Sequence, residues 1–208
     1  MILIGQYDSP FVRRVGIALT LYGIDFEHRA WSVFGDGEKI AEYNPLRRVP
    51  TLVLDDGTAL LDSTTILLEL DERVSPDAAL IPASGAARRH QLRLCALAAG
   101  ACEKMVALIY ERALHETLSE VWIDRCTTQI EDVLDMLEAE VGLLGGNYVF
   151  GSTPGHADIA MAVAFRFLTD AHPMLRSAKP YESLAVHMAR CEALPAFQVI
   201  RQEFVPPA

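Results

Sequence analysis

The sequence lacks the features of membrane, secreted and nucleic-acid-binding proteins. No apolar run reaches the roughly 18 residues that cross a bilayer, so we expect no membrane-spanning segment. The first ten residues, MILIGQYDSP, have no basic stretch followed by a long apolar segment, so we expect no secretion signal. Basic residues are also scarce, because 18 Lys and Arg stand against 28 Asp and Glu. A net charge of -10 without a basic stripe disfavours nucleic acid and anionic membranes as partners.

Cysteine is scarce too. The four cysteines are Cys95, Cys102, Cys126 and Cys191, and no two of them are spaced as C-x-x-C. No His lies at metal-ligand spacing from any of them, so we expect neither a metal site nor a disulfide framework. Buried small hydrophobes are the better interpretation than a redox role. A reducing cytoplasm is the expected compartment.

The first 75 of the 208 residues alternate between strand and helix signals. MILIGQY predicts a strand, Pro10 to about Tyr22 a helix, DFEHRAW a strand and GEKIAEY a short helix. TLVLDDGTALL contains two strand-forming runs around a tight Asp-Asp-Gly turn, and STTILLELDERV has helical spacing. The expected order is therefore βαβαββα.

From about Ala86 onward the pattern predicts helices only. Two long amphipathic segments are followed by HADIAMAVAFRFLTDA, which is apolar nearly all round and therefore predicts a buried central helix. We expect an α/β domain at residues 1–76, a linker at 77–85 and an all-helical domain at 86–208.

The stretch SPFVRRVGIAL combines a helix start with a hydroxyl group. Ser9 is a good N-cap, and Pro10 suits the first helical position. The free N–H groups of such a turn also stabilise an anion, and a serine hydroxyl can donate to it. A thiol with a pKa of about 8.5 is roughly 3% ionised at pH 7, and a position at a helix N-terminus can lower the pKa of a thiol to about 3.5–7.5. A decrease of about 2 units in the thiol pKa corresponds to about 2.7 kcal/mol of stabilisation of the thiolate relative to the thiol. Taken alone, Ser9 is more simply a cap.

Three further stretches each have a plain structural interpretation. In RRVPTLVL, Pro50 precedes a strand, where a cis bond is possible but has a base rate of only about 5–6%. In LLDSTT, Ser63 would cap a helix whose N-terminus can bind a carboxylate, and the adjacent Asp62 can hold an ammonium group. In GSTPGHADIAMA, Asp158 follows a Gly at the cap position, and His156 is more simply structural than a proton shuttle.

The order of these stretches resembles the glutathione transferase superfamily over nearly the whole chain. The first half is similar to its thioredoxin-like domain, with Ser9 at the head of the first helix, NPLRRVPTL as the cis-proline loop and Asp62-Ser63 opening the third helix. The second half is similar to the all-helical domain, including ADIA on its central helix. Each motif is weak, and the ordered combination is specific.

The resemblance implies a glutathione site with residue roles. Ser9 would donate a hydrogen bond to the glutathione sulfur. The backbone amide and carbonyl of Val49 would form hydrogen bonds with the cysteinyl residue of glutathione, and the Val49-Pro50 peptide bond would be cis. Asp62 and Ser63 match the pair that holds the γ-glutamyl ammonium and carboxylate. Arg48 is a weaker match for a partner of the glycyl carboxylate.

Some residues depart from the family pattern. Ser9 stands where disulfide-exchanging members carry cysteine, so thiol exchange is disfavoured. Zeta-type isomerases have a cysteine at the position of Phe11, which counts against maleylacetoacetate isomerisation here. Arg47 replaces the usual glycine of the proline loop, and Gly155 replaces a Ser or Thr cap. Tyr7 ends the first strand, where tyrosine-type members place a catalytic phenol, but the serine-type pattern favours Ser9.

We therefore expect an enzyme that conjugates the glutathione thiolate to a small apolar electrophile, without a metal and as a homodimer. The second substrate is expected between Ser9 and the long helix from Ala86, with walls formed by Phe11, Phe34, Met105 and Ile109. A glutathione-dependent peroxidase or dehalogenase would use the same site. A non-catalytic interaction protein with this fold is the remaining alternative.

Overall fold

The computed structural model describes residues 1–207, and the chain divides into two compact units. The first unit contains Met1–Ala83 together with Leu194–Glu203, and the second contains Ser84–Ala193 with the residues from Phe204 on. The sequence assigned the whole of 86–208 to the helical domain, whereas residues 194–203 group with the first unit. A helix of five residues, α9 (Pro195–Val199), belongs to the first unit.

The first unit is built on a four-stranded sheet with the order β2-β1-β3-β4. The strands are β1 (Ile2–Ile4), β2 (Glu27–Arg29), β3 (Thr51–Val53) and β4 (Ala59–Leu61). β1 pairs in parallel with β2 and antiparallel with β3, and β3 pairs antiparallel with β4. Three helices complete the expected βαβαββα order: α1 (Pro10–Leu21), α2 (Gly37–Ala41) and α3 (Ser63–Glu72). The predicted fold class is confirmed.

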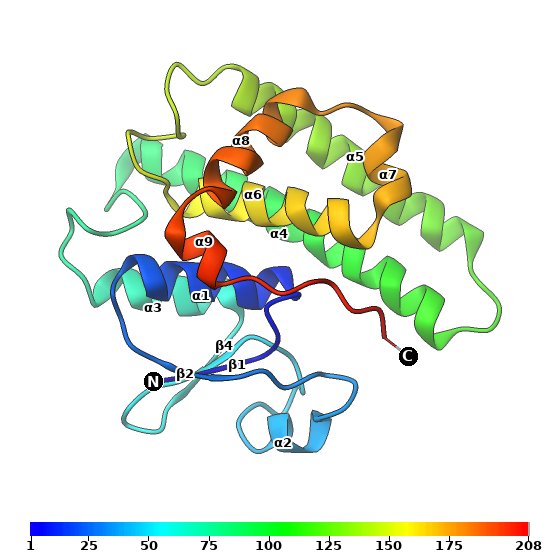
Figure 1. Cartoon of the computed structure of the whole chain (residues 1–208), viewed down its shortest axis with the longest axis horizontal. Helices are drawn as coiled ribbons and strands as arrows, with labels where there is room; N and C mark the ends of the chain where they lie inside the picture. Colours follow the sequence, from blue (N-terminus) through cyan, green and yellow to red (C-terminus); the bar gives the residue numbers. More distant parts are fainter. Residues whose placement is uncertain (208) are drawn as a thin grey trace. The chain divides into compact units, whose positions relative to one another are not determined.

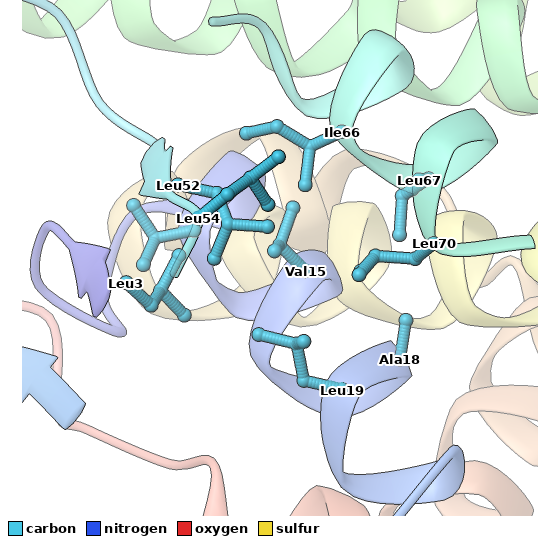
Figure 2. Close-up of a cluster of buried hydrophobic side chains, with 10 residues drawn as sticks. Leu3, Val15, Ala18, Leu19, Leu52, Leu54, Ile66, Leu67 and Leu70 are labelled. Atoms are coloured by element: carbon cyan, nitrogen blue, oxygen red, sulfur yellow. The ribbon is translucent and has the colours of Figure 1, made fainter. Parts of the chain in front are cut away.

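Alternate residues of the strands pack on opposite faces of this sheet. Leu3 and Leu52 face α1 and α3 in one cluster, which also contains Val15, Ala18, Leu19, Leu54, Ile66, Leu67 and Leu70 (Figure 2). Ile4 and Val53, one residue further along each strand, pack with Ile40 of α2 on the other face. This two-residue period follows from the pleat of the strands. It places α1 and α3 side by side on one face of the sheet (Figure 1).

The second unit consists of helices within its described residues, apart from the connecting loops, the C-terminal segment and an isolated bridge between Tyr148 and Gly151. It contains α4 (Gly85–Leu114), α5 (Glu120–Gly142), α6 (His156–Ala171), α7 (Pro173–Ala178) and α8 (Glu182–Glu192). Twelve of the sixteen residues of α6 are buried, so the prediction of a buried central helix is confirmed. None of the described helices combines the length and the apolar character that crossing a membrane requires.

The first turn of α6 is fixed by one buried carboxylate. Asp158 has no exposed surface, and its Oδ2 accepts a hydrogen bond from the amide of Gly155, the N-cap, at 2.9 Å. Its Oδ1 accepts from the amide of Val149 at 3.0 Å. Burial raises the pKa of Asp158, and the two amide hydrogen bonds oppose that shift. Asp158 therefore joins the loop before α6 to the helix.

Candidate functional site

The register of the sheet brings three turns to one edge. Ile4, the last residue of β1, pairs with Thr51, the first residue of β3, and Thr51 pairs with Leu61, the last residue of β4. The chain therefore leaves β1 toward Ser9, enters β3 from Val49-Pro50 and leaves β4 into Asp62-Ser63 at the same edge. The three candidate stretches of the first unit are neighbours although they span 55 positions of sequence.

Gly5 lets two of these turns approach closely. Its φ is +128°, and a Cβ at this position would lie 2.5 Å from Cγ2 of Val12 and 2.8 Å from Cβ of Val49. Real side chains do not tolerate such distances, so only glycine fits without movement of α1 or of the proline loop. The loop that leads to Ser9 thus packs directly against Val49.

Ser9 is the N-cap of α1, as the sequence predicts. Its Oγ accepts from the amide of Val12 at 3.5 Å, which is long for a hydrogen bond. Its side chain is partly exposed, and the first turn of α1 contains no acidic residue. The positive end of the helix dipole is therefore not neutralised within that turn, and the Ser9 hydroxyl is placed to donate to an anion there.

Tyr7 is packed as a structural residue. Its ring stacks on His28, with centroids 3.9 Å apart and 6° between the planes, and it packs against the core of the first unit. The ring also passes over α1, because a Cβ on Gly16 would lie 3.2 Å from Tyr7 Cε1. Burial raises the pKa of Tyr7 to about 12, which makes the phenol a weaker acid. The Tyr7 ring is therefore packed inside the first unit, whereas the Ser9 side chain is partly exposed.

The start of α3 differs by one residue from the expectation. Asp62 is the N-cap, with Oδ1 accepting from the amide of Thr64 at 2.7 Å, and Ser63 is the first helical residue. The sequence suggested Ser63 because a serine is a common cap, whereas the chain reaches the helix through a left-handed Asp62 with a φ of +69°. Such backbone conformations cost on the order of 1–3 kcal/mol and gather at functional sites. Ser63 is buried and Asp62 is exposed, so an acceptor for a cation stands beside a helix N-terminus that has no acidic residue in its first turn.

The proline loop is held in shape by Asn44, which sequence reasoning missed. The Val49-Pro50 peptide bond is cis. The buried Nδ2 of Asn44 donates to the carbonyl of Arg48 at 2.8 Å and to Oγ1 of Thr51 at 3.0 Å, and its Oδ1 accepts from the amide of Leu46 at 2.9 Å. The Asn44 side chain therefore connects residues on both sides of Val49 and fixes the position of Val49. An Asn beside a proline is a common turn residue, so its sequence position gave no sign of this role.

The two arginines of the proline loop have different surroundings. Arg47 has a φ of +52°, a conformation that glycine adopts more readily than arginine, and its guanidinium pairs with Glu38 at 2.5 Å. The Arg48 side chain is exposed. The Arg48 backbone carbonyl accepts the hydrogen bond from Asn44.

Arg13 and Arg14 are buried and form hydrogen bonds to distant segments, which the sequence did not indicate. Arg14 Nη2 donates to Oγ1 of Thr64 at 2.8 Å and so joins α1 to the first turn of α3. Arg13 Nε donates to the carbonyl of Ile200 at 2.9 Å, within the same unit. A pair of arginines on a helix usually indicates a solvated face, and only the folded chain shows what each one binds.

The four residues expected to contact a second substrate divide between the two units. Phe11 is half-buried on α1, and Phe34 is 47% exposed in the loop before α2. Met105 and Ile109 lie on α4, where Ile109 is partly exposed. Met105 has no exposed surface, and its carbonyl accepts from Nε2 of the buried His172 at 3.0 Å. Met105 is therefore a core residue of the helical unit, and it lines no open surface.

Metal and cysteine chemistry have little support at this site. Within residues 1–207, no three His, Cys, Asp or Glu side chains gather in a way that could hold a metal ion. All four cysteines are free and buried in the second unit, as is His156.

Two family models match the sequence. The N-terminal domain of glutathione S-transferase matches residues 3–78, and the C-terminal domain matches residues 120–190. The uncharacterized GST-like protein YibF of Escherichia coli is 32% identical over 81% of this chain and 82% of its own length. The maleylacetoacetate isomerase of Pseudomonas aeruginosa is 28% identical over 95% and 97% of the two chains. A solved glutathione transferase family member from Pseudomonas fluorescens, with bound glutathione, is 32% identical with a TM-score of 0.84, covering 100% of this chain and 99% of that one.

Proposed function

Since the chain belongs to the glutathione S-transferase superfamily, we propose that it binds glutathione at the sheet edge described above and activates its thiol for attack on a small apolar electrophile. The observation that carries the proposal is the convergence of two helix N-termini, α1 and α3, neither of which has an acidic residue in its first turn. Glutathione carries two carboxylates and a thiol, so it offers anionic groups to both helix starts; at α3 the exposed Asp62 carboxylate binds the amide of Thr64.

The γ-glutamyl end of glutathione fits the start of α3. Its carboxylate would accept from the Ser63 hydroxyl and the free amides of the first turn, and its ammonium would lie beside the exposed Asp62. The peptide backbone of the ligand would pair with the amide and carbonyl of Val49, a residue that Asn44 holds in position through the Arg48 carbonyl. The Arg48 guanidinium would reach the glycyl carboxylate.

The chemistry would occur at the start of α1. Ser9 donates its O–H to the glutathione sulfur, and the helix dipole favours the thiolate over the thiol. Breaking the long contact from the Val12 amide to Ser9 Oγ costs little, so the hydroxyl can reorient toward a ligand. The thiol loses its proton to water. The thiolate then forms a carbon–sulfur bond, and the electrophile either releases its leaving group as an anion or takes up the electron pair and a proton when a double bond or an epoxide ring opens. Ser9 forms no covalent bond.

Glutathione-dependent isomerisation is the second candidate. The maleylacetoacetate isomerase relative, aligned over almost the whole of both chains, favours it. Phe11 disfavours it, because the half-buried ring stands two residues after Ser9, where isomerases of the zeta type carry a cysteine. Isomerisation also consumes no glutathione, whereas conjugation consumes one thiol per turnover, so thiol loss distinguishes the two.

The proposal has three further parts. Phe11, Phe34 and Ile109 remain candidates for contacts with the second substrate. A homodimer is the expected assembly, which light scattering tests directly. A cytoplasmic location suits both the four free cysteines and the use of glutathione.

The experiment is a paired measurement of binding and turnover. Calorimetry with glutathione should give saturable binding, and a panel of aryl halides, enones, cis-4-oxo-2-enoates, epoxides and hydroperoxides should identify at least one compound whose turnover needs glutathione. Product analysis by mass spectrometry separates a conjugate from an isomer or a disulfide. Binding without turnover on any of them would favour an interaction protein, and absence of binding would refute the proposed site.

A further inference from the structure

Residues 197–202 lie along α1 within the first unit, far in sequence from the helix they contact. The buried Arg13 of α1 donates from Nε to the carbonyl of Ile200 at 2.9 Å and from Nη2 to the carbonyl of Phe197 at 3.2 Å. Its guanidinium also lies 5.9 Å from the centre of the Phe197 ring. Arg13 thus binds the backbone of this segment at two points, and an ammonium group could not match that two-point geometry.

The packing of Ile200 sets how close the segment comes to α1. Ile200 is buried, and a Cβ on Gly16 would lie 2.9 Å from its Cγ2 and 3.2 Å from Tyr7 Cε1. Glycine at position 16 therefore admits both side chains to the surface of α1. Ile200 and Tyr7 consequently lie against the same spot on the helix.

Two residues later, Gln202 contacts the turn that carries Ser9. Its Oε1 accepts a hydrogen bond from the amide of Tyr7 at 3.1 Å, across 195 positions of sequence. That turn runs from Gly5, whose amide donates to the Arg29 carbonyl at 2.9 Å, to Ser9, whose amide donates to the Gln6 carbonyl at 3.2 Å. Gln202 therefore restrains the middle of this turn through its hydrogen bond with the Tyr7 amide.

We propose that Gln202 is a positioning residue for Ser9: by binding the Tyr7 amide, it fixes the turn so that the Ser9 hydroxyl meets the sulfur of bound glutathione. This inference rests on the proposed function of Ser9. Arg13 and Ile200 fix residues 197–202 against α1, and Gln202 in turn fixes residues 5–9 through the Tyr7 amide. Displacement of a reacting group by about 1 Å can cost on the order of a hundredfold in rate, so a single hydrogen bond at this position matters for chemistry.

The test uses Gln202→Ala, the acceptor-retaining Gln202→Glu and a matched control, Arg201→Ala, at an exposed neighbour. Without any ligand, hydrogen–deuterium exchange of the peptide that covers residues 5–9 should be about tenfold faster in Gln202→Ala, because the Tyr7 amide loses its partner. Gln202→Glu should restore protection, and Arg201→Ala should match the parent protein. Unchanged exchange in Gln202→Ala would overturn the proposal.

With glutathione, Gln202→Ala should raise the pKa of the bound thiol and lower kcat about tenfold, while KM for glutathione changes less than about twofold. A purely structural role would lower thermal stability and leave the bound thiol's pKa as it is in the parent protein, which would also overturn the proposal. A parent protein that binds no glutathione would refute the proposed function instead, and the exchange measurement separates that failure from this one.

Discussion

Helices α1 and α3 of the first unit begin differently from α6 of the second. The first turns of α1 and α3 contain no acidic residue, and their caps, Ser9 and Asp62, are partly or fully open to solvent. The first turn of α6 contains Asp158, whose two oxygens bind two backbone amides without any exposed surface. The same electrostatic device therefore has two uses. At α6 a buried carboxylate binds two amides, and the helix start holds the fold together. At α1 no carboxylate lies in the first turn, and at α3 the capping carboxylate of Asp62 is exposed and binds the amide of Thr64, so an anionic ligand can reach both helix starts.

Removal of the internal anion should give the largest effect. Asp158→Ala leaves the amides of Gly155 and Val149 buried without their partner, and each such loss costs about 1–3 kcal/mol. Urea unfolding should show a loss of roughly 2–5 kcal/mol. Asp158→Asn keeps one acceptor oxygen and should lose less. Equal stability of Asp158→Ala and the parent protein would show that the carboxylate has no such role.

Removal of the hydroxyl at α1 should affect chemistry and leave the fold intact. Ser9→Ala should lower kcat by roughly one to three orders of magnitude, corresponding to about 1.5–4 kcal/mol, while glutathione still binds. Tyr7→Phe is the matched control, and its kcat should change less than about threefold because the phenol is packed on His28. The reverse pattern of rates would assign the catalytic role to Tyr7.

At α3, the charge of Asp62 can be separated from its role as a cap. Asn is as good an N-cap as Asp and also tolerates a positive φ, so Asp62→Asn should keep the melting temperature of the parent protein. Loss of the charge beside the γ-glutamyl ammonium should weaken glutathione binding about tenfold, as measured by calorimetry. Native affinity in this variant would contradict the assignment of Asp62.

The smallest expected effect is a pH dependence confined to the second unit. Burial lowers the pKa of His172 from its ordinary value, although its Nε2 hydrogen bond to the Met105 carbonyl opposes the shift. At a pH of about 6, His172 is therefore protonated to a greater extent in the unfolded chain than in the folded chain. This contribution to stability is complete above the ordinary histidine pKa of about 6.5 and is lost as the pH falls below it toward the folded value.

A titrating His172 can be recognised by comparing unfolding at two pH values. The unfolding free energy of the parent protein should decrease between pH 8 and pH 5, and His172→Gln should show a shallower decrease. Identical slopes for the two proteins would exclude His172 as the titrating group.

Features coded by neighbouring residues could be predicted from the sequence. The strand and helix order, the Ser9 cap and the buried α6 follow from local patterns, because each depends on residues within one element. The start of α3 was misplaced by one residue, because a positive φ at a non-glycine residue has no local signature.

Features that depend on distant partners could not be predicted. The ties from Arg13 to Ile200 and from Gln202 to Tyr7 join residues 187 and 195 positions apart, and nothing in either short stretch identifies the other. The burial of Met105 depends likewise on which face of α4 the other helices cover. For the same reason, the return of α9 to the first unit had no signal in a helical pattern that continues to the end of the chain.

The central claim is that the first turn of α1 supplies the charge stabilisation a bound thiolate needs. Ultraviolet difference absorbance of the thiolate in the complex with glutathione, titrated against pH, tests it most directly. The apparent pKa of the bound thiol should be about 6.5, roughly 2 units below that of the free thiol, and it should be higher in Ser9→Ala. Glutathione that binds but keeps the pKa of the free thiol would contradict it.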